Sequence, residues 1–179
     1  MLEPVATVVY VPENITLTRG EDNASIVPIL GGGMVASWSI SPELPEGMVF
    51  DNGSITGVPL VNSTNTTYTV TALNSGGTAI AFLNITVVEP VAVLTFDERF
   101  FGTRGETLFN ATVNNTGGTV ATWEIEPALP DGVGLWDGWL YGTPSVNLSE
   151  TTFTIWANNS GGSANILSLI HISEPTRQP

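Results

Sequence analysis

One stretch decides the fold of this chain and occurs twice, first as Trp38-Ser-Ile-Ser-Pro-Glu-Leu-Pro-Glu-Gly-Met-Val-Phe-Asp-Asn-Gly-Ser-Ile-Thr-Gly-Val-Pro59. The second copy is Trp123-Glu-Ile-Glu-Pro-Ala-Leu-Pro-Asp-Gly-Val-Gly-Leu-Trp-Asp-Gly-Trp-Leu-Tyr-Gly-Thr-Pro144, and its tryptophan follows that of the first copy by 85 positions. Arg19 and Arg104 keep the same spacing. A constant period of this length predicts two copies of one domain in tandem, because solenoid repeats are shorter and cannot bury a core alone.

Prolines and turn residues within each copy predict extended structure. Pro42 and Pro45 exclude a helix, because each fixes its own φ and pushes the residue before it into an extended conformation. Asn52-Gly53 is a strong hairpin signal, so Met48–Asp51 and Ser54–Thr56 are predicted to pair.

The rest of the first copy reads as strands bounded by glycine and proline. β-branched residues flank Pro12, Pro28 interrupts the second strand, and Gly31–Gly33 predicts a hairpin into the tryptophan strand. The other expected strands span 6–11 with 15–18, 24–30, 34–40, 67–72 and 79–87. About seven strands per copy, without a helical period, predict an all-β protein of two tandem β-sandwiches.

Strand alternation predicts the core of each sandwich. Trp38 and Trp123 are expected to face inward, because they are the largest apolar groups available to so small a core. Tyr68 and Phe153 occupy matching positions in the two copies and are expected core residues as well.

The predicted domains are residues 1–89 and 90–166, joined at Glu89-Pro90 without a flexible linker. The chain has no cysteine, so packing and ladder hydrogen bonds must stabilise each copy without disulfides.

The net charge of −13 and the absence of lysine exclude two classes of partner. A negative field repels nucleic acid and anionic lipid headgroups, whereas it suits a divalent cation or a basic partner. A solubility role for the acidic side chains is the alternative. Membrane insertion is not expected either, because no apolar run approaches the ~20 residues of a membrane span.

The motifs Trp-x-Ile-x-Pro-x-Leu-Pro-x-Gly, Gly-x-Pro and Ala-x-Asn-Ser-Gly-Gly occur in both copies. Residues 1–166 therefore resemble, twice, the immunoglobulin-like (He-PIG) repeats of microbial surface proteins, which are similar to dystroglycan-type cadherin-like domains. The resemblance implies an immunoglobulin-like or cadherin-like sandwich, an extracellular or cell-surface location and neighbouring repeats in a longer chain. It implies no catalytic residues.

The C-terminal segment departs from the repeat. Residues 167–177 resemble the conceptual translation of a sequencing-library adapter, so residues 167–179 are interpreted as a non-native tail and the last strand of the second copy as truncated. The register nevertheless sets Ile170 and Ile172 where Ile85 and Val87 stand, which would allow the tail to complete that strand.

Catalytic chemistry has few candidate groups. The only histidine, His171, lies in the tail, and lysine and cysteine are absent, so nucleophilic triads are excluded. Glu124 and Glu126 share one strand face, but serines replace them in the first copy, and a solvated surface is the favoured interpretation. The chain is therefore not expected to be an enzyme.

No cofactor is expected, with calcium as the one candidate ion. Glu89, Asp97 and Glu98 lie around the junction, where cadherin-like chains bind calcium, although the closely spaced ligand motifs of cadherins are missing. Scattered solvated acids are the alternative interpretation.

Three aromatic residues distinguish the second copy. Trp136, Trp139 and Tyr141 alternate with Leu135 and Leu140 and are predicted to point outward. They could stabilise the hairpin or contact a neighbouring domain, or they could bind a glycan or a cell-surface protein. The favoured function is a non-enzymatic spacer and adhesion repeat of a secreted microbial protein, and the alternative is a carbohydrate- or ligand-binding module.

Overall fold

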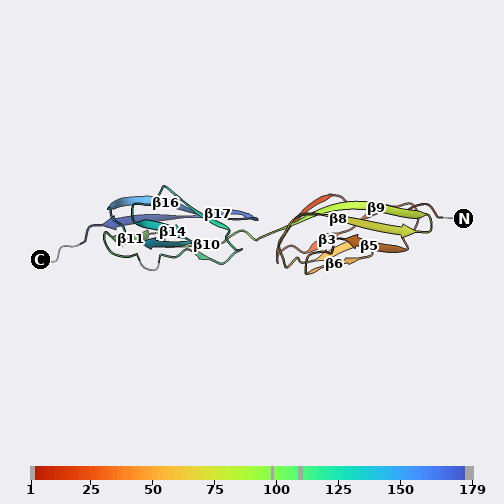
Figure 1. Ribbon diagram of the computed structural model, residues 1–179, viewed down its shortest axis with the longest axis horizontal. Coiled ribbons are helices and arrows are strands. Elements are labelled where there is room, and N and C mark those ends of the chain that lie inside the picture. The colour runs from red at the N-terminus through yellow and green to blue at the C-terminus, as the bar shows by residue number, and fades with distance from the viewer. Residues whose placement is uncertain (1–2, 98, 109–110, 176–179) are drawn as a thin grey trace. The chain divides into compact units, whose positions relative to one another are not determined.

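The computed structural model of the chain describes residues 3–97, 99–108 and 111–175. These residues form strands and loops, and no helix among them could span a membrane. The chain divides into two compact units, unit 1 from Met1 to Glu89 and unit 2 from Pro90 to Pro179 (Figure 1). The prediction of an all-β protein with two sandwiches is confirmed.

Unit 1 is built from two facing sheets and a short ribbon. Its strands are β1 (Thr7–Val9), β2 (Asn14–Thr18), β3 (Ala24–Ile26), β4 (Ile29–Gly31), β5 (Ser37–Ser41), β6 (Met48–Asp51), β7 (Ser54–Gly57), β8 (Ser63–Asn74) and β9 (Gly77–Val88). The sheet orders are β2-β9-β8-β5 and β3-β7-β6, and β1 pairs with β4. Only β2 and β9 run parallel among these pairs in the described part of unit 1.

The core of unit 1 lies between the two sheets. Ile55 of β7 and Leu83 and Ile85 of β9 are completely buried, and Tyr68 of β8 is buried beside them. Strict alternation along β8 and β9 places every second side chain in this core. The β8–β9 hairpin, with twelve residues in each strand, therefore supplies most of one wall of the sandwich.

Unit 2 repeats this architecture. Its strands are β10 (Leu94–Thr95), β11 (Arg99–Thr103), β12 (Asn114–Asn115), β13 (Thr122–Glu126), β14 (Val133–Trp136), β15 (Trp139–Gly142), β16 (Leu148–Asn159) and β17 (Gly162–Ser173). The large sheet has the order β11-β17-β16-β13, and β11 runs parallel to β17. Residues 111–113 bond to β15, as β3 bonds to β7 in unit 1.

The structure of unit 2 continues past residue 166, where the sequence analysis ends the repeat. Strand β17 continues to Ser173 and is as long as β9, so the last strand is not truncated. Ile170 and Ile172 are buried next to Phe153, in the positions that the register predicts. Residues 167–173 therefore belong structurally to unit 2, because alternation continues through them without a break.

The two tryptophans face inward but are only partly buried. Trp38 packs against the core and covers the turn glycine Gly53, where an added Cβ would lie 2.7 Å from the indole ring. Trp123 covers Gly138 in the same way. The fully buried centre of unit 1 is formed instead by smaller side chains, since the indole is used to close the sandwich over its hairpin turn.

The predicted hairpin at Gly31–Gly33 does not form. Strand β4 pairs with β1, whereas β5 pairs with β8 in the other sheet. An added Cβ at Gly32 or Gly33 would lie 2.2 Å from a backbone carbonyl oxygen of Val5 or Pro4. These glycines are required because the entering chain passes against them, not because they turn a hairpin.

The two units satisfy one turn carbonyl in different ways. In unit 2, the N–H of Val113 donates to the Gly138 carbonyl at 2.8 Å. Unit 1 has Pro28 at the equivalent position, which has no N–H. There the buried Tyr10 hydroxyl donates to the Gly53 carbonyl at 2.6 Å.

The opening strands of the two units explain why a side-chain hydroxyl is the donor in unit 1 and a backbone N–H is the donor in unit 2. Val5 lies against Gly77, and Val91 lies against Gly162. The opening strands of the two units are therefore separated in sequence by one residue more than the period of the rest of the repeat. Tyr10 then corresponds to Phe96, which has no hydroxyl. Unit 1 thus combines Tyr10 with Pro28, whereas unit 2 combines Phe96 with Val113, whose backbone N–H is the donor.

Replacing Tyr10 with phenylalanine is expected to destabilise unit 1 by about 1–3 kcal/mol, because it leaves the buried Gly53 carbonyl without a donor. Adding Pro28→Val should recover stability, because it restores the N–H that unit 2 uses. Thermal unfolding of Tyr10→Phe, Pro28→Val and the double variant measures this coupling. Equal stabilities of Tyr10→Phe and the double variant would contradict it.

The pH dependence provides an independent readout of the same tyrosine. Burial raises the pKa of Tyr10 to about 12. The unfolded chain therefore releases this proton near pH 10 while unit 1 retains it, so the contribution to stability is present below pH 10 and is lost as the pH rises towards 12. Burial also raises the pKa of Tyr68, which stays in both proteins. The stability of Tyr10→Phe should fall less steeply above pH 10 than that of the unchanged chain.

Candidate functional site

The exposed aromatic residues of unit 2 lie on one face of the β14–β15 hairpin. Trp136 stands directly opposite Trp139 across the turn, and Tyr141 follows two residues later on the same face. Their exposed fractions are 67%, 44% and 43%, so all three point outward as alternation predicts. The buried Leu140 fills the opposite face.

Two of the rings, those of Trp139 and Tyr141, are held in place by their neighbours. Tyr141 and Trp139 have ring centroids 5.9 Å apart with their planes inclined by 45°. The Tyr141 ring lies over Gly134, its cross-strand partner, where an added Cβ would meet the ring at 2.7 Å. Gly134 therefore provides the space that lets the tyrosine ring lie down against the sheet.

The equivalent hairpin of unit 1 has the same backbone and different side chains. Asn52 and Asp137, the first turn residues, both have φ +47°, and the strand pairing is equivalent. Val49, Asp51, Ser54 and Thr56 stand where unit 2 has Gly134, Trp136, Trp139 and Tyr141. The fold thus closes this turn without the aromatic side chains.

A depression of about 330 Å³ lies beside Trp136, between β14 and the edge strand β13. Its lining includes Trp136, the turn residue Asp137 and Thr122. An aromatic, an acidic and a hydroxyl-bearing residue thus line one opening. Sequence analysis missed the contributions of Asp137 and Thr122, because only the packing of β13 against β14 brings them next to the tryptophan.

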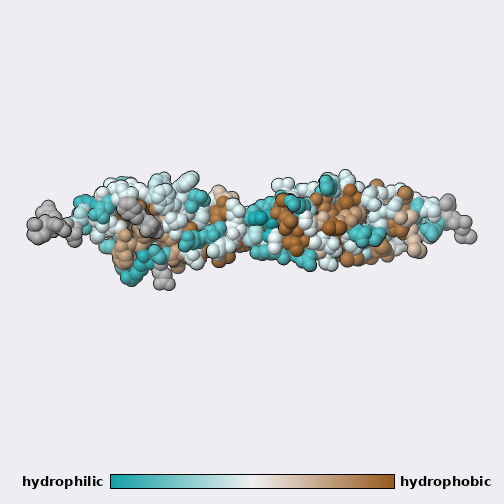
Figure 2. Space-filling view, turned by 90° about the horizontal axis from the view of Figure 1, so that it is seen from below, coloured by the Kyte–Doolittle hydropathy of each residue, from teal (hydrophilic) through white to brown (hydrophobic). Residues whose placement is uncertain are grey.

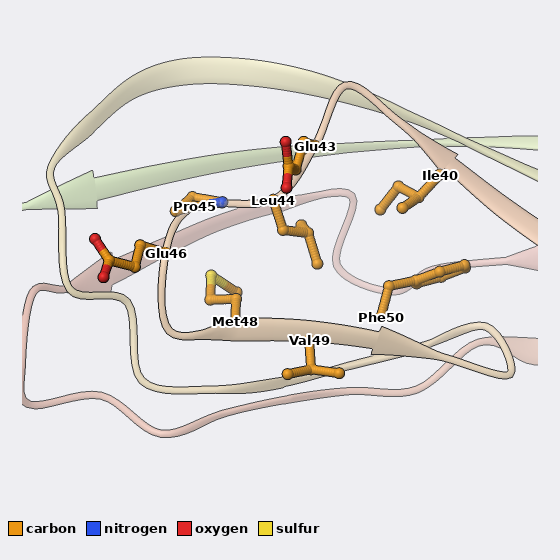
Figure 3. A pocket seen from close by; sticks show the side chains of 8 residues that line it. All are labelled: Ile40, Glu43, Leu44, Pro45, Glu46, Met48, Val49 and Phe50. Carbon is orange, nitrogen blue, oxygen red and sulfur yellow. The ribbon is translucent and has the colours of Figure 1, made fainter.

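Unit 1 has a groove of its own at a different position from the depression of unit 2. Figure 3 shows Ile40, Leu44 and Phe50 directed into a space of about 460 Å³ between the proline-rich loop and β6, with Glu43 and Glu46 at its rim. No aromatic row adjoins this groove, because the outward face of the unit 1 hairpin carries Val49, Asp51, Ser54 and Thr56. The two hairpins therefore present different side chains on the same backbone.

The outer surfaces differ elsewhere as well. Figure 2 shows hydrophobic residues gathered in patches on one face of unit 1. Val9 pairs with Ile29 across β1 and β4, and Val9, Ile80 and Phe82 line one shallow depression. Unit 2 has mostly polar residues at these places, namely Thr95, Asn114, Asn165 and Leu167.

Of the candidate calcium ligands that the structure describes, Glu89 is engaged by other side chains of unit 1. Arg19 and Asn62 both donate to the Glu89 carboxylate, at 2.8 Å and 2.6 Å. Asp97 is exposed, and Glu98 lies outside the described residues. Among the residues that the structure does describe, no group of three or more acidic or histidine side chains could hold a metal ion.

The same three residue types recur at the end of unit 2. Arg104 and Asn147 donate to the Glu174 carboxylate at 2.7 Å and 2.6 Å, as Arg19 and Asn62 do to Glu89. The hydrogen bond to Glu89 raises the pKa of Arg19, so its charge is retained. In both units the set ties the end of the last strand to the turn that follows the parallel strand.

The paired acids of β13 do not form a catalytic cleft. Glu124 and Glu126 are both exposed on the outer face of the large sheet. The amide of Asn158 donates to Glu124 at 3.1 Å across the sheet. This environment is that of a solvated sheet surface.

Comparison with known proteins agrees with this architecture. Residues 5–88 match the family model He_PIG, whose description is "Putative Ig domain". Unit 1 belongs to this family. Unit 2 repeats the strand order of the He_PIG unit, with the same parallel pairing at the sheet edge.

Solved structures confirm the tandem immunoglobulin fold. The chain is similar to Drosophila OTK extracellular domains 3–5 (TM-score 0.53, 17% identity, covering 94% of this chain and 62% of that one). It is also similar to titin domains A168–A170 (TM-score 0.58, 15% identity, 96% and 66%) and to the N-terminal four domains of Dscam1 (TM-score 0.58, 13% identity, 96% and 46%). The chain thus spans about three fifths of the OTK structure. No curated protein sequence matches it at a significant level.

Proposed function

We propose that this chain is a non-enzymatic spacer and adhesion module of a secreted or cell-surface microbial protein, with further repeats as its neighbours. Tandem immunoglobulin-like domains are typical of stalk and adhesion modules. The observation that carries the proposal is the parallel pairing of an early strand with the last strand of each unit, β2 with β9 and β11 with β17.

This pairing places the entry and exit of a unit at opposite ends of the large sheet. The entering Pro4 carbonyl accepts a hydrogen bond from Asn74 at the β8–β9 turn. The exit residue Glu89 bonds instead to Arg19, which directly follows β2 at the far end of β9. A pull on the two ends of unit 1 therefore strains the β2–β9 hydrogen bonds together, because these bonds lie across the direction of the force.

Unit 2 has the corresponding arrangement within itself. The Pro90 carbonyl accepts from Asn159 at one end, and Glu174 bonds to Arg104 at the other. Each unit can thus transmit tension from one end to the other while its core stays closed. This property suits a spacer, and it requires no ligand.

Stretching single molecules of the chain tests the proposal. Two separate unfolding events are expected, each releasing about 300 Å at roughly 3.5 Å per residue. Extension without resolved events, as for an unfolded chain, would refute a spacer that withstands tension.

A cross-linked variant identifies the event of unit 1. Thr16 and Thr86 are register partners in the parallel pair, and the chain has no cysteine of its own. Oxidised Thr16→Cys/Thr86→Cys encloses nearly all of unit 1 in one loop, so its event should disappear while that of unit 2 remains. Reduction should restore both events.

The surface location rests on the family and on charge. The He_PIG match and the similarity to the extracellular domains of OTK support a role outside the cell. The net charge of −13 favours solubility and disfavours binding to nucleic acid. Antibodies against unit 1 should label intact cells of the source organism, and labelling only after permeabilisation would contradict this location.

A further inference from the structure

We propose that the β14–β15 hairpin of unit 2 carries a binding site for a neutral oligosaccharide, with Trp136, Trp139 and Tyr141 stacked against sugar rings and Asp137 and Thr122 bonded to sugar hydroxyls. This site adds a ligand-binding activity to the spacer. It does not depend on the mechanical behaviour of the chain.

The first argument is that folding does not require the three rings. Unit 1 forms the same hairpin, with the same turn φ and register, from Asp51, Ser54 and Thr56. Exposed aromatic side chains gathered on one face are uncommon in soluble proteins and mark interaction surfaces. Unit 1 thus serves as an internal comparison, because its hairpin has the same fold without the three aromatic rings.

The second argument concerns shape. Trp136 and Trp139 are cross-strand neighbours, and Tyr141 follows Trp139 along the strand at a centroid distance of 5.9 Å. The rings of Trp139 and Tyr141 therefore form a row along β15, and Trp136 stands beside it on β14. Successive sugar rings of an oligosaccharide also form a row, and each has an apolar C–H face that can lie on an aromatic ring. A row is less suited to a single cation, which is bound best by rings that surround it.

The third argument concerns the groups beside the row. The depression next to Trp136 is lined by Asp137, whose carboxylate accepts hydrogen bonds, and by Thr122, whose hydroxyl accepts one from Asn158 at 3.4 Å and can donate one. Its volume of about 330 Å³ lies within the range of small-ligand sites. Apolar rings next to a few polar groups match the mixed surface of a sugar.

The fourth argument restricts the ligand to neutral sugars. Residues 90–166 contain eight acidic residues against Arg99 and Arg104, and no cationic side chain lines the depression. An anionic sugar would therefore be repelled by the unit and would find no partner in the site.

The test uses the full chain and a set of defined probes. Cellohexaose, xylohexaose, mannohexaose and laminarihexaose are titrated while tryptophan fluorescence is recorded, with hexagalacturonate as the anionic probe and hexa-arginine as the cationic one. Binding of at least one neutral probe and none of hexagalacturonate is expected. The variant Trp136→Asp/Trp139→Ser/Tyr141→Thr, which installs the residues of unit 1, should bind that probe at least tenfold more weakly.

Two controls separate binding from folding. The triple variant should keep the unfolding temperature of unit 2 within a few degrees, since unit 1 folds with these residues; if it unfolds, Trp136→Ala alone is measured, because this ring is the most exposed. The reverse graft, Val49→Gly/Asp51→Trp/Ser54→Trp/Thr56→Tyr, should give unit 1 binding of the same probe even when unit 2 carries the triple substitution.

Three results would overturn the proposal. The first is that no neutral probe binds the unchanged chain. The second is that the unchanged chain and the folded triple variant bind equally. The third is that hexa-arginine binds the aromatic face while the sugars do not, which would assign the face to a basic protein segment.

Discussion

Gly57→Ala is expected to unfold unit 1 and to leave unit 2 folded. Gly57 ends β7 with φ +111°, and an added Cβ would lie 2.2 Å from the Gly47 carbonyl oxygen. The backbone of Met48 follows at 3.2 Å, so no flexible side chain can move aside. A steric conflict with backbone, added to a conformation that side chains rarely adopt, should cost more than about 4 kcal/mol, a large part of the stability of a small domain.

Gly20 provides the matched control. It also has a positive φ, +72°, but an added Cβ would meet nothing within 4 Å. Gly20→Ala should therefore cost only about 1–2 kcal/mol, the usual penalty for a left-handed conformation. Calorimetry of both variants resolves the transitions of the two units. Similar losses from the two substitutions would show that the contact with Gly47 has no effect.

Ending the chain after Ile166 is expected to unfold unit 2 while unit 1 keeps its transition. The deletion removes Ile170 and Ile172 from the core and takes away the parallel partner of β11. Each lost aliphatic side chain costs about 2–5 kcal/mol, so the two together are comparable with the whole stability expected for a domain of this size.

A chain ending after Glu174 is the control for this prediction. It keeps the whole of β17 and the bond from Arg104 to Glu174. Two-dimensional amide spectra of both chains should show dispersed signals from unit 2 only in the longer one. A folded unit 2 in the chain that ends at Ile166 would show that the first half of β17 is sufficient.

Local signals predicted the fold well where they act within one hairpin. Asn52-Gly53 specified a turn by its own chemistry, and the alternation of β8 and β9 identified Tyr68 as a core residue. Gly31–Gly33 gave the wrong hairpin, because a glycine needed for a close approach looks the same in sequence as a glycine in a turn. The sequence also did not reveal that the opening strands are separated by one residue more than the rest of the repeat, because Tyr10 of unit 1 is replaced by Phe96 in unit 2.

The candidate site likewise contains some residues that local sequence patterns predict and others that they do not. The outward direction of Trp136, Trp139 and Tyr141 follows from period-two alternation and could be predicted. The contribution of Thr122 could not be predicted, because it depends on the packing of β13 against β14, which belong to different sheets. The hydrogen bonds from Arg19 and Asn62 to Glu89 could not be predicted either, because these residues are distant in sequence.

The exchange of a hydroxyl donor for a backbone donor also bears on how two similar domains fold side by side in one polypeptide. If the first strand of unit 2 entered unit 1, Phe96 would meet the turn that Pro28 leaves without an N–H, and the Gly53 carbonyl would be buried unpaired. Adjacent homologous domains are prone to trade strands during folding. The mismatch between their opening strands penalises that error.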